Sequence, residues 1–484
     1  MTPQAQAPVA ATTGWAGDAA ALQRSHIIHA KYPVAGASGW LPHGYALCSR
    51  VVDAFRGLFA EGGYEELGLP SAVPLSALER QAGSIKSFLD RVYLLRDAEG
   101  QGAPGGGEPL VLASTIEAQI SLVMADWLAE GRTPPFRVTT VRTVGRHEGH
   151  GMRPLWMERF VWPFFEAQAA FTGDSAADTA FLLHGPGRVA AGMGLATFAV
   201  ERVKEPGAGG AYADRRHELV TLLPEGTSTT LTSVYELGTR FSETFGVHSA
   251  GEPLSMLNFG FSARLVLALL VHSHADPERP VYHPSVAPVQ VAVVPSVLEG
   301  IEEAAALAAA LGERGVRAEV YDDHRGRRAR IAKARSHGAP LFLTVEGPER
   351  GGQLLLGADA DAGDPVDPEG GPDALAEQVT ARLEALGTEL RRVRAAEHSS
   401  RVLDLDAFPG PDTVPAAARV PLCRAEACAG AALGNLAGLN VIGRLAGENG
   451  VPSDEAAAPH RPCAGCGRPT GSSVLLGRKF RGEK

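Results

Sequence analysis

The sequence has few cysteines, no long apolar run and no recognisable export signal. Five cysteines in 484 residues are too few for a disulfide framework, which excludes a small disulfide-rich secreted protein. Apolar runs such as Leu265–Val271 are far shorter than the roughly 20 residues that a membrane-spanning helix needs. Residues 1–20 are rich in Ala, Thr and Pro and lack the basic-then-apolar pattern of a signal peptide. We therefore expect a flexible tail at 1–20 in a cytoplasmic protein.

Positive charge is also in deficit. The net charge of −10 at pH 7 argues against a protein whose whole surface binds nucleic acid, although an enzyme with a local basic patch remains compatible with it. Hydrophobic residues make up 45% and charged residues 21% of the chain, as in ordinary globular proteins. A chain of 484 residues is too long for one hydrophobic core and suggests about two to four domains.

The pattern of the stretch Arg142–Phe171 predicts a long antiparallel hairpin. Strand-forming Val, Thr, Phe and Trp residues flank the charged, glycine-containing loop Gly149–Glu158. Arg146 and Glu148 are two residues apart at the end of the first strand, so we expect them on one face. A guanidinium can hold a phosphate oxygen and a carboxylate can accept from the adenine amino group, which predicts an ATP site. A solvated ion pair on an edge strand has the same pattern.

Two junctions between a strand and a helix carry further candidate residues. Pro109–Glu117 reads as a strand that presents Thr115 and Glu117 before a helix. Gly260–Arg264 joins an aromatic strand to an apolar helix. An arginine at the start of a hydrophobic helix needs an anionic partner, because burying an unpaired charge costs several kcal/mol, and a phosphate would supply that partner.

The order of these motifs resembles the class II aminoacyl-tRNA synthetases, and most specifically prolyl-tRNA synthetase of the archaeal/eukaryotic-like type. Arg146-His147-Glu148 is similar to motif 2 of that class, Gly260-Phe261-Ser262-Ala263-Arg264 to motif 3, and Thr115 with Glu117 to the pair that holds the amino acid. The resemblance runs from about Tyr32 to Phe480. It implies an α+β catalytic domain with an antiparallel sheet and helices, a small α/β anticodon-binding-like domain and a C-terminal zinc-binding α+β domain.

The resemblance also implies an activity and a set of site residues. The family activates proline with ATP as the aminoacyl adenylate and transfers it to tRNA, so we expect this chain to act on proline or a related amino or imino acid. Mg²⁺ would bridge the phosphates with few dedicated protein ligands. Arg146 and Arg264 would be catalytic. ATP would be bound by Arg146, Glu148, Arg153 and Arg264, and the amino acid by Thr115, Glu117, Arg146, Phe164 and Gln168.

The segment Gly44–Pro70 resembles motif 1, which forms the dimer interface in this class. It combines an amphipathic helix at Ala46–Ala60 with a strand that carries Pro70. The resemblance implies a homodimer, with a six- or seven-stranded antiparallel sheet in each catalytic domain, although an ordinary helix–turn–strand unit has the same pattern. Ser175–Glu205 reads as helical, and Leu219–Gly238 reads as two strands around a Pro-Glu-Gly turn.

Some residues depart from the family's pattern around the expected amino-acid site. The family's Glu-Gly-His is Glu166-Ala167-Gln168 here, and its preceding Trp aligns with Phe164 or Phe165. The family's Gln-x-Gly-Thr-Ser-His strand falls on Thr230–Tyr235, which lacks the Gln, Gly and His and also fits a plain core strand. Changes in the size of a site alter discrimination by about 1–3 kcal/mol. Activation is therefore expected to survive while the preferred amino acid shifts.

The second half of the chain predicts two smaller domains. Strand and helix signals alternate from Val289 to Val345, which predicts an α/β unit, and an acidic Gly/Pro loop at Ala358–Pro372 precedes a last helix at Asp373–Glu397. The basic stretch Arg325–Arg335 fits contact with a phosphate backbone or a solvated helix face. The family's acidic residue before its Gly-x-Pro turn is absent at Gly338-Ala339-Pro340, which weakens the expectation of base-specific anticodon reading.

Four of the five cysteines lie close to the C-terminal end. Cys423, Cys428, Cys463 and Cys466 form two pairs that can complete a tetrahedral zinc site. Four thiolates leave no open coordination position, so such a zinc would be structural. Four unpaired buried thiols are the alternative, and Cys48 is expected in a core.

Three interpretations of function remain open from the sequence. The first is a divergent prolyl-tRNA ligase, the second a paralogue that gives its adenylate to a non-tRNA acceptor, and the third a non-catalytic binding protein. The expected divisions are a tail at 1–20, a catalytic domain at 21–285, an anticodon-binding-like domain at 286–397 and a zinc-binding domain at 398–484.

Overall fold

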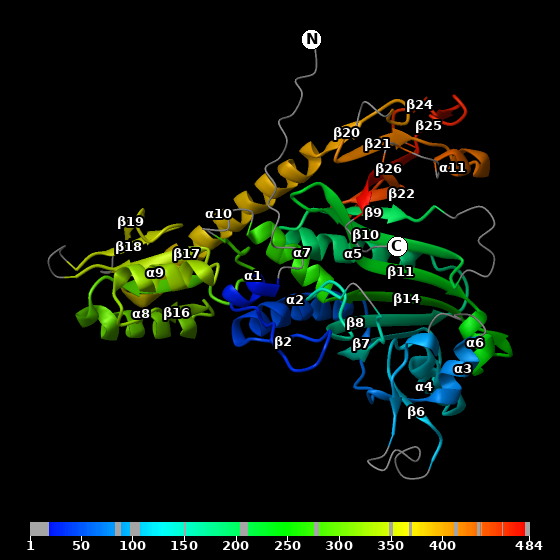
Figure 1. The fold of residues 1–484 in the computed structure, drawn as a ribbon, viewed down its shortest axis with the longest axis horizontal. Coiled ribbons are helices and arrows are strands. Elements are labelled where there is room, and N and C mark those ends of the chain that lie inside the picture. Colours follow the sequence, from blue (N-terminus) through cyan, green and yellow to red (C-terminus); the bar gives the residue numbers. More distant parts are fainter. Residues whose placement is uncertain are drawn as a thin grey trace.

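The computed structural model of the chain combines a long sheet with two sets of helices (Figure 1). It describes residues 19–82, 89–96, 107–149, 152–203, 212–274, 280–347, 352–366, 370–410, 415–432, 436, 438–456 and 458–479. Most of the tail expected at 1–20 therefore lies outside the described residues. In the described part of the chain, no helix is both long enough and apolar enough to cross a membrane.

Six antiparallel strands form the centre of the long sheet, in the order β9-β10-β11-β14-β8-β7. They are β9 (Phe198–Glu201), β10 (Arg215–Leu222), β11 (Thr227–Gly238), β14 (Ser255–Ser262), β8 (Phe160–Phe171) and β7 (Phe136–Gly145). The short edge strand β3 (Glu65–Glu66) pairs with β7 in parallel. The expected antiparallel sheet and the hairpin are thus confirmed, except that the seventh strand is parallel.

One face of this sheet is apolar and is covered by α2 (Pro42–Glu61), α5 (Ala176–Gly192) and α7 (Ala263–Ser273). Phe165 of β8 and Phe261 of β14 stack on this face, with ring centroids 5.0 Å apart. Phe55 of α2 packs against Phe261 with a centroid distance of 4.4 Å. Because side chains alternate along a strand, Glu166 and its neighbours of the same parity point to the opposite face. That opposite face carries the candidate site.

A second layer of helices lies on the site face of the sheet, at the β7 side. It contains α3 (Leu75–Ala82), α4 (Glu117–Ala129) and α6 (Arg240–Phe245). Their core includes Ile120 and Met124 of α4, Phe241 of α6 and Met256 of β14. A small sheet of β4 (Ala72–Pro74), β6 (Leu110–Leu112) and β5 (Leu94–Leu95) leads into α4 and places its first turn.

Two local expectations in this region were wrong. The predicted strand around Pro70 is split into β3 and β4, which belong to different sheets, and the Pro70 carbonyl instead accepts hydrogen bonds from Gln119 and Arg142. The predicted helix Ser175–Glu205 ends with α5 at Gly192 and is followed by β9. Gly194 has a positive φ of 75°, a conformation that ends helices and favours glycine.

The α/β unit has the expected alternation of strands and helices. Its sheet order is β16-β15-β17-β18-β19, with parallel pairing of β15 to β16 and β17. The elements are β15 (Val291–Pro295), η2 (Leu298–Gly300), α8 (Ile301–Glu313), β16 (Ala318–Val320), α9 (Arg327–Ser336), β17 (Leu341–Val345), β18 (Leu354–Gly357), β19 (Asp364–Val366) and α10 (Gly371–Ser400). The prediction of a loop at Ala358–Pro372 was wrong in part, because this segment contains β19.

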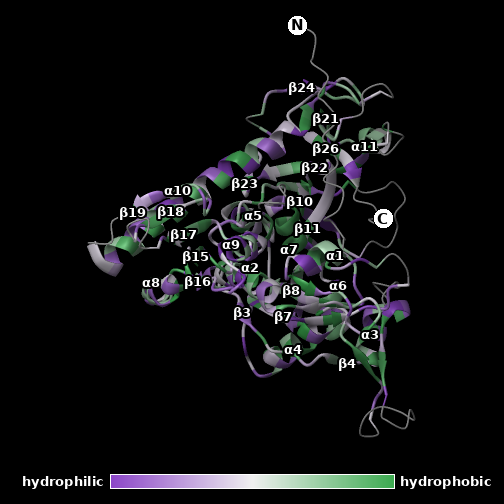
Figure 2. Cartoon of the chain, turned by 60° about the vertical axis from the view of Figure 1, so that its left-hand side comes forward, coloured by the Kyte–Doolittle hydropathy of each residue, from purple (hydrophilic) through white to green (hydrophobic). Residues whose placement is uncertain are grey.

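The C-terminal strands extend the long sheet. β20 (Val402–Asp404), β21 (Ala417–Pro421), β26 (Ser473–Lys479) and β22 (Asn440–Glu448) continue it past β9, and β26 also pairs with β11 in parallel. The remaining elements there are α11 (Glu426–Ala432), β23 (Val451–Pro452), β24 (Arg461–Pro462) and β25 (Pro469–Thr470). Helix α10 joins the α/β unit to these strands (Figure 1). Its hydropathy alternates along its length (Figure 2), because Leu375, Val379 and Leu383 pack into the α/β core.

The first described segment precedes α2 and packs beside it. It comprises α1 (Ala19–Arg24), β1 (Ile28–His29) and β2 (Gly39–Trp40), while η1 (Leu89–Arg91), β12 (His248–Ser249) and β13 (Glu252–Pro253) are short connections elsewhere. Cys48 of α2 is fully buried in the core that these elements share. The expectation of a core position for this cysteine is confirmed.

Candidate active site

Thr115, Glu117 and Glu166 meet at the N-terminal end of α4. The Thr115 hydroxyl donates to Glu166 Oε1 over 3.2 Å, and the Tyr212 hydroxyl donates to Glu117 Oε1. The three side chains are only 3–5% exposed. Among the described residues, Glu117 Oε2 and Glu166 Oε2 have no hydrogen-bond partner. Buried polar atoms are nearly always paired, so the two open carboxylate oxygens mark a place for a cationic ligand group.

The protonation of these two carboxyls depends on the surrounding charge. Burial, together with the Glu117 carboxylate, raises the pKa of Glu166 to about 8, although Arg142 and Arg146 act against this. Burial also raises the pKa of Glu117, opposed by the hydrogen bond from Tyr212. A cation placed between them would favour both ionised forms. The site is therefore suited to an ammonium or a protonated imino nitrogen.

Arg142 of β7 and Arg146, which directly follows β7, brace the chain before α4. Arg142 is 8% exposed and donates to Gln119 Oε1 over 2.5 Å and to the Thr115 carbonyl over 2.9 Å. Arg146 donates from Nε and Nη2 to the Ser114 carbonyl over 3.1 and 2.9 Å. Sequence reasoning missed Arg142. Its position directly opposite Phe164 puts it on the site face.

The second hairpin strand settles which phenylalanine belongs to the site. The ring of Phe164 lies 4.7 Å from the Arg146 guanidinium, whereas Phe165 is fully buried in the core on the other face. Gln168 shares the face of Phe164 and Glu166 and is fully buried. Its Nε2 lies 3.3 Å from the Met256 sulfur. Of the two candidate phenylalanines, Phe164 is therefore the one that lies on the face of the candidate site.

Glu148 lies beyond the end of the strand, so the expectation that it shares a strand face with Arg146 was wrong. β7 ends at Gly145, and the Glu148 amide turns back to donate to the Arg146 carbonyl over 2.8 Å. The Glu148 carboxylate lies 3.5 Å from Arg91. Arg159 donates to the Glu148 carbonyl over 3.1 Å, which anchors this turn to the returning strand.

The hairpin loop that carries Arg153 also contacts Arg264. The Arg153 amide and the Met157 carbonyl form a short bridge of 2.9 Å. The next turn presents Trp156, whose ring lies 4.4 Å from the Arg264 guanidinium and whose carbonyl accepts from Arg264 over 3.3 Å. Ser262 caps α7 by accepting from the Arg264 amide over 3.4 Å. The helix start thus directs Arg264 toward the loop that carries Arg153.

Half of the divergent strand Thr230–Tyr235 faces the site. Ser233 and Tyr235 lie opposite Gly260 and Asn258 of β14, and Tyr235 packs edge-on against Tyr212 with ring centroids 5.1 Å apart. Thr232 and Val234 alternate with them and are buried. Tyr235 also packs against the core formed by α3, α4 and α6, so the interpretation of this strand as core and its interpretation as part of a site both stay predictions.

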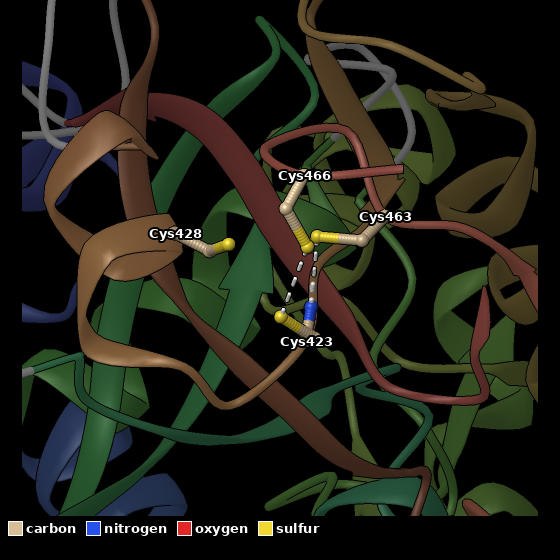
Figure 3. A group of neighbouring side chains, drawn as sticks. All are labelled: Cys423, Cys428, Cys463 and Cys466. Carbon is tan, nitrogen blue, oxygen red and sulfur yellow. Dashed lines mark hydrogen bonds between the residues drawn. The ribbon is translucent and has the colours of Figure 1, made fainter. Parts of the chain in front are cut away.

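The four C-terminal cysteines gather in one cluster (Figure 3). Their sulfur atoms all lie within 4.8 Å of one another, and Cys423 Sγ lies 3.8 Å from Cys466 Sγ. Four thiolates around a zinc at about 2.3 Å would be about 3.8 Å apart. The Arg468 guanidinium lowers the pKa of Cys466 to about 6. The donor set and spacing fit a tetrahedral metal ion.

Comparisons with known proteins place this geometry in context. No family model matches the chain. The chain is 30% identical to a proline--tRNA ligase of Methanopyrus kandleri over 62% of this chain and 63% of that protein. It is 27% identical to the Ignicoccus hospitalis ligase over 91% of this chain and 92% of that one, and 26% identical to the Methanothrix thermoacetophila ligase over 95% of each.

Solved structures agree over nearly the whole chain. Prolyl-tRNA synthetase of Giardia lamblia, in complex with prolyl-adenylate, has a TM-score of 0.80 at 20% identity and covers 95% of this chain and 97% of its own. The enzyme from Cryptosporidium parvum, with halofuginone and AMPPNP, has a TM-score of 0.80 at 18% identity and covers 97% and 96%. The chain is similar to class II prolyl-tRNA synthetases along nearly its whole length.

The basic stretch Arg325–Arg335 is largely neutralised within its own α/β unit. Arg330 is 1% exposed and donates to the carbonyls of Asp323 and Pro295. The other paired arginines are Arg325 with Asp323 at 2.5 Å, Arg327 with Asp361 at 2.6 Å, and Arg335 with Asp359 at 2.8 Å. Arg327 and Arg335 of α9 therefore hold the acidic loop in place.

Proposed function

We propose that this chain activates proline or a close imino acid with ATP, forming the aminoacyl adenylate, and transfers it to tRNA. The observation that carries the proposal is the buried cluster at the start of α4, where two carboxyls with open oxygens lie beside the Thr115 hydroxyl and the arginines 142 and 146. A zwitterionic amino acid needs this combination of anionic and cationic partners. The proline--tRNA ligases and the adenylate complex among the relatives support the same assignment.

The residues have distinct proposed roles. Thr115 and Glu117 hold the imino nitrogen, and Phe164 and Gln168 bound the side chain of the amino acid. Arg146 bridges the carboxylate and the α-phosphate, where it offsets charge that builds during attack on phosphorus. Arg264 and Arg153 hold the far end of the triphosphate, and Glu148 orients the adenine. Mg²⁺, when bound with the nucleotide, would neutralise part of the charge of the triphosphate.

The other parts of the chain support this chemistry. We assign residues 21–285 to the catalytic domain, 286–397 to an anticodon-binding-like domain and 398–484 to a zinc-binding domain. Cys423, Cys428, Cys463 and Cys466 would hold one structural zinc. We further propose a cytoplasmic homodimer whose interface is built on Gly44–Pro70.

Amino-acid-dependent exchange of pyrophosphate into ATP tests activation directly. We expect exchange with proline or a close imino acid and none with the other standard amino acids. The matched control is Glu117→Ala, which should raise the KM for the amino acid and leave the KM for ATP nearly unchanged. If the wild-type protein binds ATP but gives no exchange with any amino or imino acid, the chain is a binding protein and the enzymatic proposal fails.

One observation favours an acceptor other than tRNA for the activated amino acid. Because Arg325, Arg327 and Arg335 are paired with carboxylates of their own unit, fewer basic side chains of this stretch are available to hold an RNA backbone. A paralogue that passes its adenylate to a non-tRNA acceptor is therefore the alternative function. Aminoacylation of total tRNA with the best amino acid from the exchange panel separates the two. Charged tRNA supports the first proposal, whereas strong exchange without charging supports the second.

A further inference from the structure

Two buried amides lie side by side under the first turns of α4. Gln168 of β8 and Asn258 of β14 are direct partners in the register of the antiparallel pair, so their side chains leave the same face of the sheet and their Cβ atoms are about 4.5–5.5 Å apart. Gln168 is fully buried and Asn258 is 3% exposed. They share this face with Glu166, two residues before Gln168 and about 7 Å away along the strand.

Each amide keeps one polar atom without a partner in the described part of the chain. These atoms are Gln168 Oε1, an acceptor, and Asn258 Nδ2, a donor. A buried polar group without a partner costs about 1–3 kcal/mol, and such groups need an explanation such as a ligand or a bound water. The pair therefore offers one acceptor and one donor to whatever lies between α4 and the sheet.

A hydroxyl group is the simplest complement to this pair, since it donates one hydrogen bond and accepts others. It would donate to Gln168 and accept from Asn258. Glu166 lies two positions from Gln168 on the same face of β8, so a ring whose nitrogen is held beside the Glu166 carboxyl would have its far side toward the two amides. Unsubstituted proline offers only CH₂ groups there and would leave both amides unsatisfied.

We propose that the preferred substrate is a proline-like imino acid with a hydroxyl or another small hydrogen-bonding group on its ring, read by Gln168 and Asn258. This inference rests on the proposed activation of imino acids and adds the substrate class. A site built to hydrogen-bond a substrate hydroxyl rejects the analogue that lacks it far more strongly than an apolar site rejects a missing methylene. The two amides are thus specificity-determining residues.

The test compares ring substituents of similar size in the exchange assay. L-Proline, cis- and trans-4-hydroxy-L-proline and 4-methyl-L-proline are measured with the wild-type protein. We expect kcat/KM for one hydroxyproline isomer to exceed that for proline by about tenfold or more and that for the methyl analogue by a larger factor, because the methyl group fills the space and leaves both amides unpaired. Equal or better exchange with proline would overturn the inference and leave the proposed function standing. Silence with every imino acid would remove both.

Two variants test whether Gln168 and Asn258 cause the preference for a hydroxylated ring. Gln168→Met and Asn258→Leu keep the volume and remove the hydrogen-bonding atoms, so we expect the ratio of hydroxyproline to methylproline activity to fall toward one. Gln378→Met on α10, in the α/β unit, is the matched control and should keep the wild-type ratio. A ratio unchanged in both site variants would show that a bound water, rather than the substrate, satisfies the amides. If neither variant folds, the wild-type ratio alone decides.

Discussion

Thr115 and Glu166 join the two elements that make up the proposed amino-acid site, through a hydrogen bond of 3.2 Å between the hydroxyl and the carboxyl. Thr115 precedes α4 and Glu166 lies on β8, so this contact crosses from the helical layer to the sheet. Both side chains are nearly fully buried, and their relative position fixes the gap in which Glu117 faces Glu166. The site is thus held by the fold before any substrate arrives, which is what preorganised binding requires.

The first prediction concerns the pH dependence of stability. Burial raises the pKa of Glu166 from 4.5 to about 8, so the folded protein keeps a proton that the unfolded chain loses above about pH 4.5. The stability that this group contributes is therefore present at low pH and is lost as the pH rises through about 8. Glu166→Gln, which mimics the protonated form, should flatten the fall of the melting temperature between pH 5 and 8. A wild-type slope that persists in the variant would contradict the buried, protonated carboxyl.

The second prediction concerns the cysteine cluster. Protein purified without chelator should contain one zinc per chain by metal analysis, because four thiolates at this spacing form a closed site. Cys463→Ser should lose the metal and destabilise the C-terminal strands more than it slows adenylate formation. Cys48→Ala, at a buried position in another core, is the matched control and should keep the zinc. Metal-free wild-type protein would refute the site.

The third prediction is a homodimer through α2 and the segment that follows it. Ala60 is exposed on α2 in the single chain, and a charged side chain there would disrupt a contact between two copies. Light scattering should give a dimer for the wild type at micromolar concentration and a larger monomer fraction for Ala60→Arg. Ala305→Arg, at an exposed position of α8, should leave the dimer intact. A wild-type monomer at every concentration would exclude this interface.

Strongly periodic segments and short motifs of fixed chemistry were predictable from the sequence. The strand that ends in Gly260–Arg264 and its apolar helix were predicted correctly, as was the alternation of strands and helices in the α/β unit. The clustering of the four C-terminal cysteines was predicted from their spacing. In each case the signal is local, because neighbouring residues alone determine hydrophobic period, caps and ligand spacing.

The missed features depend on contacts between segments far apart in the chain. Arg142 looks like an ordinary polar residue in an alternating strand, and only the packing of α4 over β7 shows that it braces the Thr115 carbonyl. Tyr212 follows a stretch with no periodic signal, yet its hydroxyl reaches Glu117. The extension of the central sheet by β22 and β26 is a pairing of strands more than 200 residues apart. Sequence periodicity carries no information on such partners.

The last prediction separates the two arginines proposed to handle ATP. Arg146 braces the chain before α4 at Ser114 and lies over Phe164, next to the proposed site of attack. Arg146→Ala should slow adenylate formation by about 10²–10³, the effect of removing one charge-assisted contact made mainly in the transition state. Circular dichroism should show a folded protein, and Arg132→Ala, at an exposed surface arginine, should keep the wild-type rate.

Arg264→Ala should have a different kinetic signature. Its guanidinium lies at the hairpin loop against Trp156, where it would hold the triphosphate already in the ground state. Loss of such uniform binding raises KM without a matching fall in kcat. We therefore expect a higher KM for ATP in Arg264→Ala and a lower kcat in Arg146→Ala, measured by exchange at saturating imino acid. If Arg264→Ala instead lowered kcat at an unchanged KM for ATP, Arg264 would be the residue that stabilises the transition state, and the roles assigned to the two ends of the site would have to be exchanged.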